Sequence, residues 1–174
     1  MSRLGALLVV VAACGTQFPT GPADLTGINP AVMSAGAVSF TGSDGSGNIV
    51  LGWKLQFFTN GSGFDCLSTS ADEVADIDIF TNQTPNGNAK AMLVSGQEVS
   101  IVPDNPPTAQ GGAVAHMPIN GIHSVNGGVM LTDVHVNQSS NEIDRFVGMV
   151  NAAGTSDAGD TIDITGMFTS PVCE

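Results

Sequence analysis

The chain has 174 residues, of which 42% are hydrophobic and 11% are charged. A chain of this length is expected to form one domain around a sizeable core. Four basic residues against sixteen acidic ones give a formal net charge of −12. Proteins bind nucleic acids and anionic lipid headgroups through clustered Lys and Arg side chains. The acidic charge of this chain therefore argues against both kinds of partner. Twenty-two glycines and nine prolines, with Asn and Asp clusters between short apolar runs, favour an all-β domain over a helical one.

The N-terminus has the pattern expected of a secretion signal. Arg3 supplies a positive charge, and the apolar run Leu4–Val11 is far shorter than the roughly 20 residues of a membrane-spanning helix. The following order, Val11-Ala12-Ala13-Cys14, resembles the lipobox of bacterial lipoproteins. This resemblance implies that residues 1–13 are removed as a signal peptide and that the Cys14 sulfur carries a diacylglycerol. The alternative is an ordinary secretory signal cut after Ala13, which would leave a free thiol.

The remaining cysteines, Cys66 and Cys173, form an even pair once Cys14 is lipidated. Exported proteins meet an oxidising compartment, so we expect a disulfide between them. Gly15 follows the lipidated cysteine, and by resemblance to Gram-negative lipoproteins this favours the outer membrane over the inner one; a periplasmic or secreted protein is the alternative. Residues 14–33 are expected to form the lipidated cysteine and a flexible tether, and residues 34–174 a single β domain.

Short apolar or alternating segments recur after the tether and predict eight or nine strands. Because no helical pattern separates them, we expect an antiparallel β-sandwich or a small β-barrel. The longest irregular stretch, residues 103–112, is expected to be a surface loop. The predicted strands are Ala37–Thr41, Ile49–Phe58, Asp76–Thr81, Ala89–Val94, Glu98–Val102, Ala113–Met117, Val129–Val136, Ile143–Val150 and Thr161–Phe168.

Local patterns within these segments predict which side chains enter the core. Trp53, Leu55 and Phe57 share one face of their strand and are expected to be buried. The apolar phase slips by one residue around Thr132-Asp133, which predicts a β-bulge. Ser70-Ala71-Asp72-Glu73 matches a capping box and predicts one helical turn before the strand that starts at Asp76.

The last predicted strand places Ile162, Ile164, Gly166 and Phe168 on one side. It runs into Gly166-Met167-Phe168-Thr169-Ser170-Pro171-Val172-Cys173, which resembles the G-x-F-x-x-P-x-C closure of some small predicted bacterial lipoproteins of unknown role. This resemblance covers about the last 45 residues, and it implies no activity.

Candidate metal ligands do not form a recognisable motif. The spacings of His116, His123 and His135 match neither a helical pair nor a zinc finger, which favours separate polar or core histidines. The segment Asp44–Asn48 resembles only part of a calcium loop, because no glycine or glutamate stands at the required positions, and it is expected to form a solvated hairpin turn. The acidic residues Asp72, Glu73, Asp76 and Asp78 likewise do not form a complete calcium-binding motif. Weak calcium binding by such acidic loops is an alternative. No metal and no cofactor is therefore predicted.

Catalytic constellations are not recognisable either, because no G-x-S-x-G element occurs and no acidic pair can be selected among sixteen carboxylates. The expected protein is a lipid-anchored, non-catalytic component of the cell envelope with a structural or protein-interaction role. Its partners would be the membrane, through the lipid, and an envelope protein, but not nucleic acid. The alternatives are a small-ligand carrier with a barrel interior and, less favoured, a metal-dependent envelope hydrolase.

Overall fold

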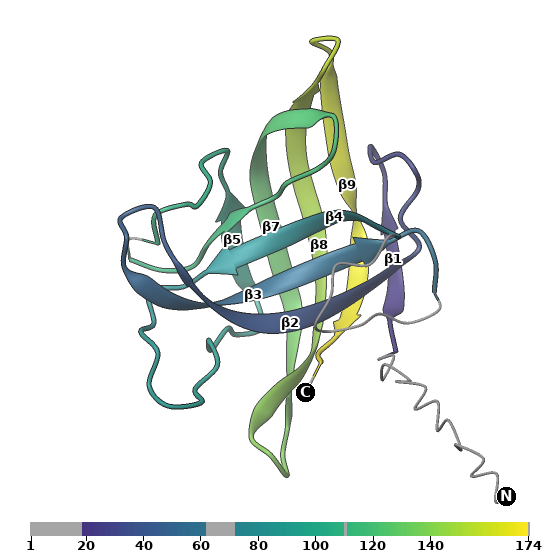
Figure 1. Ribbon diagram of the computed structural model, residues 1–174. Coiled ribbons are helices and arrows are strands. Elements are labelled where there is room, and N and C mark those ends of the chain that lie inside the picture. Colours follow the sequence, from purple (N-terminus) through teal and green to yellow (C-terminus); the bar gives the residue numbers. More distant parts are fainter. Residues whose placement is uncertain (1–18, 62–71, 110, 174) are drawn as a thin grey trace, which may run out of the picture.

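The computed structural model describes residues 19–61, 72–109 and 111–173 (Figure 1). These residues form an all-β protein, which confirms the expected fold class. No helix in this part of the chain has the length and hydropathy needed to cross a bilayer. The strands are β1 (Gly21–Leu25), β2 (Ser34–Ser43), β3 (Ile49–Phe58), β4 (Glu73–Phe80), β5 (Gln97–Ile101), β6 (Val114–His116), β7 (Ile122–Asn137), β8 (Glu142–Ser156) and β9 (Thr161–Pro171).

The strands close into a single barrel in the order β1-β2-β3-β4-β6-β5-β7-β8-β9, with β1 paired to β9. Figure 1 shows β2, β3 and β4 crossing in front of the long strands β7, β8 and β9. The expectation of antiparallel pairing needs one correction, because β5 and β6 run parallel. In the barrel order, β6 lies between β4 and β5.

The barrel begins earlier in the chain than expected. Residues 21–25 were predicted to belong to the tether, but they form β1 and pair with both β2 and β9. Burial alternates along this strand, with Ala23 and Leu25 facing the core, and Ile28 and Val32 are buried after it. The predicted domain boundary at residue 34 is therefore too late, because the barrel cannot close without β1.

The predicted strand Ala89–Val94 is also wrong, since this segment belongs to none of the nine strands. Ala91 and Leu93 are nonetheless buried in the main hydrophobic core, while Met92 and Val94 are exposed. The alternating pattern thus predicts correctly which side chains are buried here. The backbone, however, forms hydrogen bonds with side chains and not with a neighbouring strand.

Aromatic side chains fill the barrel interior. Trp53 and Phe57, predicted to be buried, are fully inaccessible to solvent, as is Phe146 on β8. The Trp53 and Phe146 rings meet edge to face with their centroids 5.0 Å apart, and Phe57 meets Phe168 in the same way at 5.6 Å. Edge-to-face pairs add about 0.5–1.5 kcal/mol each to the stabilisation from burial.

Two other local predictions are confirmed. The register of β7 against β8 shifts between Leu131 and Asp133, where the bulge was expected. Residues 44–48 form the turn between β2 and β3, in which Asp44 Oδ1 accepts hydrogen bonds from the backbone N–H groups of Ser46 and Asn48. The Asp44 carboxylate therefore stabilises the turn.

Candidate functional site

The barrel wall is incompletely paired between β4 and β7. On this side β4 pairs with β6 only through Asp78–Phe80, and β5 pairs with β7 only from Gly127 onward. The segment of residues 117–121 crosses the opening, held by isolated bridges from Ile119 to Ala75 and to Ile122. A pocket of about 510 Å³ lies at this opening.

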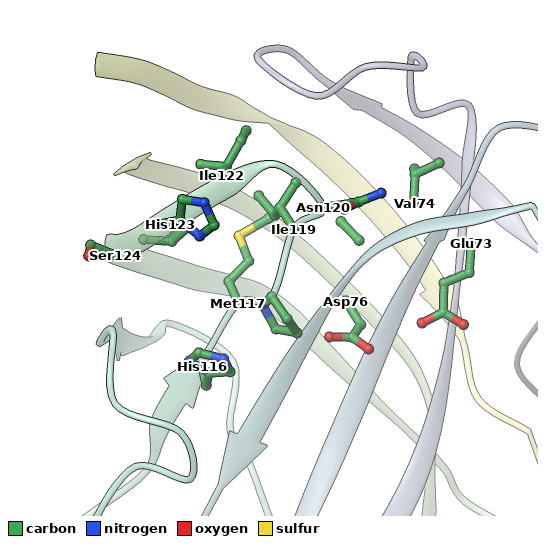
Figure 2. Close-up of a pocket in the computed structure, with 13 residues that line it drawn as sticks. Glu73, Val74, Asp76, His116, Met117, Ile119, Asn120, Ile122, His123 and Ser124 are labelled. Atoms are coloured by element: carbon green, nitrogen blue, oxygen red, sulfur yellow. The ribbon is translucent and has the colours of Figure 1, made fainter. Parts of the chain in front are cut away.

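The pocket combines an apolar wall with polar side chains on two sides. Figure 2 shows Glu73 and Asp76 on one side, His116 and His123 on the other, and the Met117 thioether between them. The apolar lining consists of Val74, Ala75, Met117, Pro118, Ile119, Ile122 and Val125, and the polar lining of Glu73, Asp76, His116, Asn120, His123 and Ser124.

A β-bulge brings Glu73 to the acidic side of the pocket. Phe57 pairs with Ala75 and Phe58 with Glu73, so Val74 is an additional residue in β4. Strict alternation from Asp76 would turn Glu73 toward the barrel interior, and the bulge restores it to the outer face. The capping box had predicted a helical turn here. That expectation is wrong for Glu73, which is the first residue of β4, while Ser70 and Ala71 lie outside the described residues.

Side chains of β3 connect the acids across the sheet. Gln56 lies opposite Asp76 in the β3–β4 register, and its Nε2 donates a hydrogen bond of 2.8 Å to Glu73 Oε2. Lys54 Nζ donates to Asp76 Oδ2 at 2.6 Å and lies 3.4 Å from Asp78 Oδ1. Burial opposes the charge on Lys54, but the hydrogen bond to Asp76 and the surrounding carboxylates raise the pKa of its ammonium group.

Three buried acceptor atoms in this group lack a hydrogen-bond donor within the described part of the chain. They are Gln56 Oε1, Asp76 Oδ1 and Asp78 Oδ1, and the residues Gln56 and Asp76 are deeply buried, with exposed fractions of 6% and 8%. A buried acceptor without a donor costs about 1–3 kcal/mol. The group is therefore short of hydrogen-bond donors.

Glu73 holds a proton near neutral pH. Burial raises the pKa of its carboxyl group to about 7, against the opposing effect of the Gln56 hydrogen bond. The charge of Asp76 contributes to this rise, and protonated Glu73 can donate a hydrogen bond to the Asp76 carboxylate. Burial and the charge of Asp76 likewise raise the pKa of Asp78. The acidic side of the pocket thus takes up a proton below pH 7 and gains a negative charge above it.

The three histidines do not come together. His116 and His123 line the pocket, but His123 Nε2 is paired with Asp157 at 2.7 Å and His116 Nδ1 lies 3.3 Å from the Val102 carbonyl oxygen. His135 Nδ1 is paired with Asp144 at 2.6 Å. Among the described residues, no group of three or more His, Cys, Asp or Glu side chains is arranged to hold a metal ion.

Of the predicted lipidation and disulfide residues, Cys173 lies within the described part of the chain. Cys14 and Cys66 lie outside the described residues. Cys173 is buried directly after β9, where its backbone N–H donates to the Ala37 carbonyl oxygen of β2 at 2.8 Å. The pairing of Cys66 with Cys173 stays a prediction.

The sequence had predicted a helical turn at Glu73 and the start of a strand at Asp76, with neither as a site residue, and it gave no sign of the pocket. Comparison of the chain with protein-family models, with curated proteins and with solved structures finds no match. Any function must accordingly be argued from the site itself.

Proposed function

We propose that this protein is a non-catalytic binding module, anchored in the outer membrane by a lipid on Cys14, that receives a basic side chain of an envelope partner in the pocket beside β4. The observation that carries the proposal is the pairing of Glu73 with buried Asp76, whose Oδ1 lacks a donor among the described residues, at a pocket of about 510 Å³.

A basic side chain supplies what this site needs. A guanidinium group carries five N–H donors and a permanent positive charge, so it can replace the proton held between Glu73 and Asp76 and donate to their carboxylates. The aliphatic stem of Arg or Lys packs well against apolar surface, and Met117, Ile119 and Val125 offer such surface in the pocket. The net charge of −12 additionally attracts a basic partner over longer distances.

The barrel interior is a poorer candidate for ligand binding. Trp53, Phe57, Phe146 and Leu55 fill it with fully buried side chains, and a carrier would need that space for its ligand. The pocket opens through the wall instead, where a side chain of another protein can enter without displacing the core.

The pocket can be tested with a peptide that contains one arginine and a matched peptide in which citrulline replaces it. Citrulline keeps the shape of arginine but has no charge. By calorimetry at pH 8 we expect the arginine peptide to bind at least about tenfold more tightly, because a hydrogen bond to a charged group contributes about 1.5–3 kcal/mol. Binding should weaken at pH 6, where Glu73 with its pKa of about 7 is mostly protonated and the cation must displace the proton.

Three variants make this test specific. Glu73→Gln should bind the arginine peptide weakly and with little difference between pH 6 and pH 8, and Asp76→Asn should weaken binding at both. Asp163→Asn removes the same charge from an exposed position on β9 that does not line the pocket, and should bind as the native protein does. Equal affinity for citrulline and arginine, or unchanged affinity in Glu73→Gln and Asp76→Asn, would contradict the proposal.

The membrane anchor has a separate test. Mass spectrometry of the protein from bacterial envelopes should find Cys14 as the first residue, with a diacylglycerol on its sulfur and residues 1–13 absent. Cys14→Ser should remove both the lipid and the sedimentation with membranes. A native chain that still carries residues 1–13, or one that begins after Ala13 with an unmodified thiol, would disprove the anchor without affecting the pocket.

A further inference from the structure

Three methionines form a row across the outer face of β7, β8 and β9. Met130 lies opposite Met149 in the β7–β8 register, and Met149 lies opposite Met167 in the β8–β9 register. Met149 is 44% exposed and Met167 is 61% exposed, while Met130 is partly buried. We call Met130, Met149 and Met167 the methionine row.

Neither burial nor strand preference accounts for these residues. The core of these strands is formed by their inward neighbours, among them Val129, Val150 and Phe168. Outward positions on strands are commonly β-branched or polar, and methionine is not among the residues enriched there. Three of the seven methionines of the chain nevertheless stand side by side on adjacent strands.

The register allows the three thioethers to converge. Adjacent strands lie about 4.8 Å apart, so the outer two backbone positions are separated by about 10 Å. A methionine side chain has three rotatable bonds and adapts its direction readily. Met130 and Met167 can therefore lean from either side toward the sulfur of Met149 above β8.

The surroundings of the methionine row favour a cation. Glu98 lies opposite Met130 in the β5–β7 register, and Asp24 lies opposite Met167 in the β1–β9 register, so the row ends in a carboxylate on both sides. A hollow of about 360 Å³ next to Met130 and Met149 is also lined by Glu98. Asp24 and Glu98 stand four strand spacings apart, about 19 Å, so they cannot share one ion but both attract positive charge.

We propose that the methionine row binds one soft monovalent metal ion, Cu(I) or Ag(I), through its three thioether sulfurs. Thioethers are soft ligands that select Cu(I), whereas Ca²⁺ and Mg²⁺ require oxygen ligands. The proposal is independent of the pocket beside β4, which shares β7 with the methionine row but none of its residues.

The experiment is a titration of the full chain with Ag(I), which needs no reductant, followed by competition for Cu(I) with a chromophoric chelator. All proteins carry Cys14→Ser, so that a thiol at this position contributes nothing. Native mass spectrometry should detect one tightly bound Ag(I) per chain. With methyl-labelled methionine, three NMR methyl signals should shift together on addition of one equivalent.

Leucine variants distinguish metal binding through sulfur from a role of the methionine row as an apolar surface. Leucine keeps the apolar character of methionine but has no sulfur atom. Met149→Leu should weaken Ag(I) binding at least tenfold, and Met130→Leu/Met167→Leu should abolish the tight site. Met33→Leu, at a position that is 63% exposed and outside the row, should bind as before. The proposal is overturned if Met149→Leu binds Ag(I) as tightly as Met33→Leu does, or if the three methyl signals fail to shift together.

Discussion

Replacing Trp53 with alanine should lower the free energy of unfolding by about 3–5 kcal/mol, the usual cost of deleting a buried aromatic side chain. Trp53 is fully buried on β3 and packs edge to face on Phe146 of β8, so it joins the two crossing layers of the barrel. Its Nε1 also donates a hydrogen bond of 2.7 Å to the Ala91 carbonyl oxygen. The variant loses the packing and leaves that carbonyl without its donor.

Urea unfolding followed by circular dichroism measures this effect; fluorescence is unsuitable because Trp53 is the single tryptophan of the chain. Trp53→Phe is the matched control, since it keeps an aromatic ring in the core but removes the N–H group. It should cost about 1–3 kcal/mol, the penalty for a buried acceptor without a donor, plus a small packing loss. A Trp53→Ala protein within about 1 kcal/mol of the native stability would contradict a closely packed interior.

The Trp53 hydrogen bond also explains why the predicted strand Ala89–Val94 is absent. Buried and exposed side chains do alternate in this segment, but its backbone groups form hydrogen bonds with side chains. Trp53 donates to Ala91, and the Gln83 side-chain amide both accepts from the Met92 N–H and donates to the Met92 carbonyl, at 2.9 and 2.8 Å. A period of two predicts which side chains are buried, and it cannot tell whether a strand or an amide side chain satisfies the backbone.

The missed strand β1 illustrates the opposite error. Its sequence, GPADL, begins with glycine and proline, which normally interrupt strands. Proline is tolerated here because Pro22 stands near the start of the strand, and Leu25 gains full burial against the core. The strand β9 was predicted nearly in full, and the bulge near Thr132 was predicted correctly. The predictions for β7 and β8 covered only about half of each strand, because they omitted residues 122–128 and 151–156.

The pocket was harder to predict than the fold. The approach of Glu73 to Asp76 depends on a bulge in β4, and the role of Gln56 depends on the β3–β4 register. A one-residue change in register reverses the face of every side chain on a strand. The sequence therefore predicted Asp76 and Asp78 in a strand and Glu73 in a preceding helical turn, but not that Glu73 and Asp76 would face one another beside a pocket.

The second large effect is expected at Gly166, where β1 closes the barrel against β9. Gly166 pairs with Leu25 of β1, has φ of +154°, and a Cβ atom there would overlap the Asp24 carbonyl oxygen. Gly166→Ala should cost about 1–3 kcal/mol for backbone strain and about 1–3 kcal/mol for the displacement of β1. Urea unfolding should find the summed loss, and hydrogen exchange should be fastest at the Thr26 amide, which donates to the Thr165 carbonyl oxygen next to Gly166.

Gly159→Ala distinguishes the two contributions, because Gly159 also has a positive φ, of +88°, but has no atom within 4 Å of the added Cβ. It should lose only about 1–3 kcal/mol from the backbone term, and the exchange rate of the Thr26 amide should not change. If both alanine variants lose equal stability, the approach of Asp24 to Gly166 contributes nothing. A larger loss at Gly166 together with faster exchange at Thr26 would instead mean that the absence of a side chain at this position lets β1 complete the barrel.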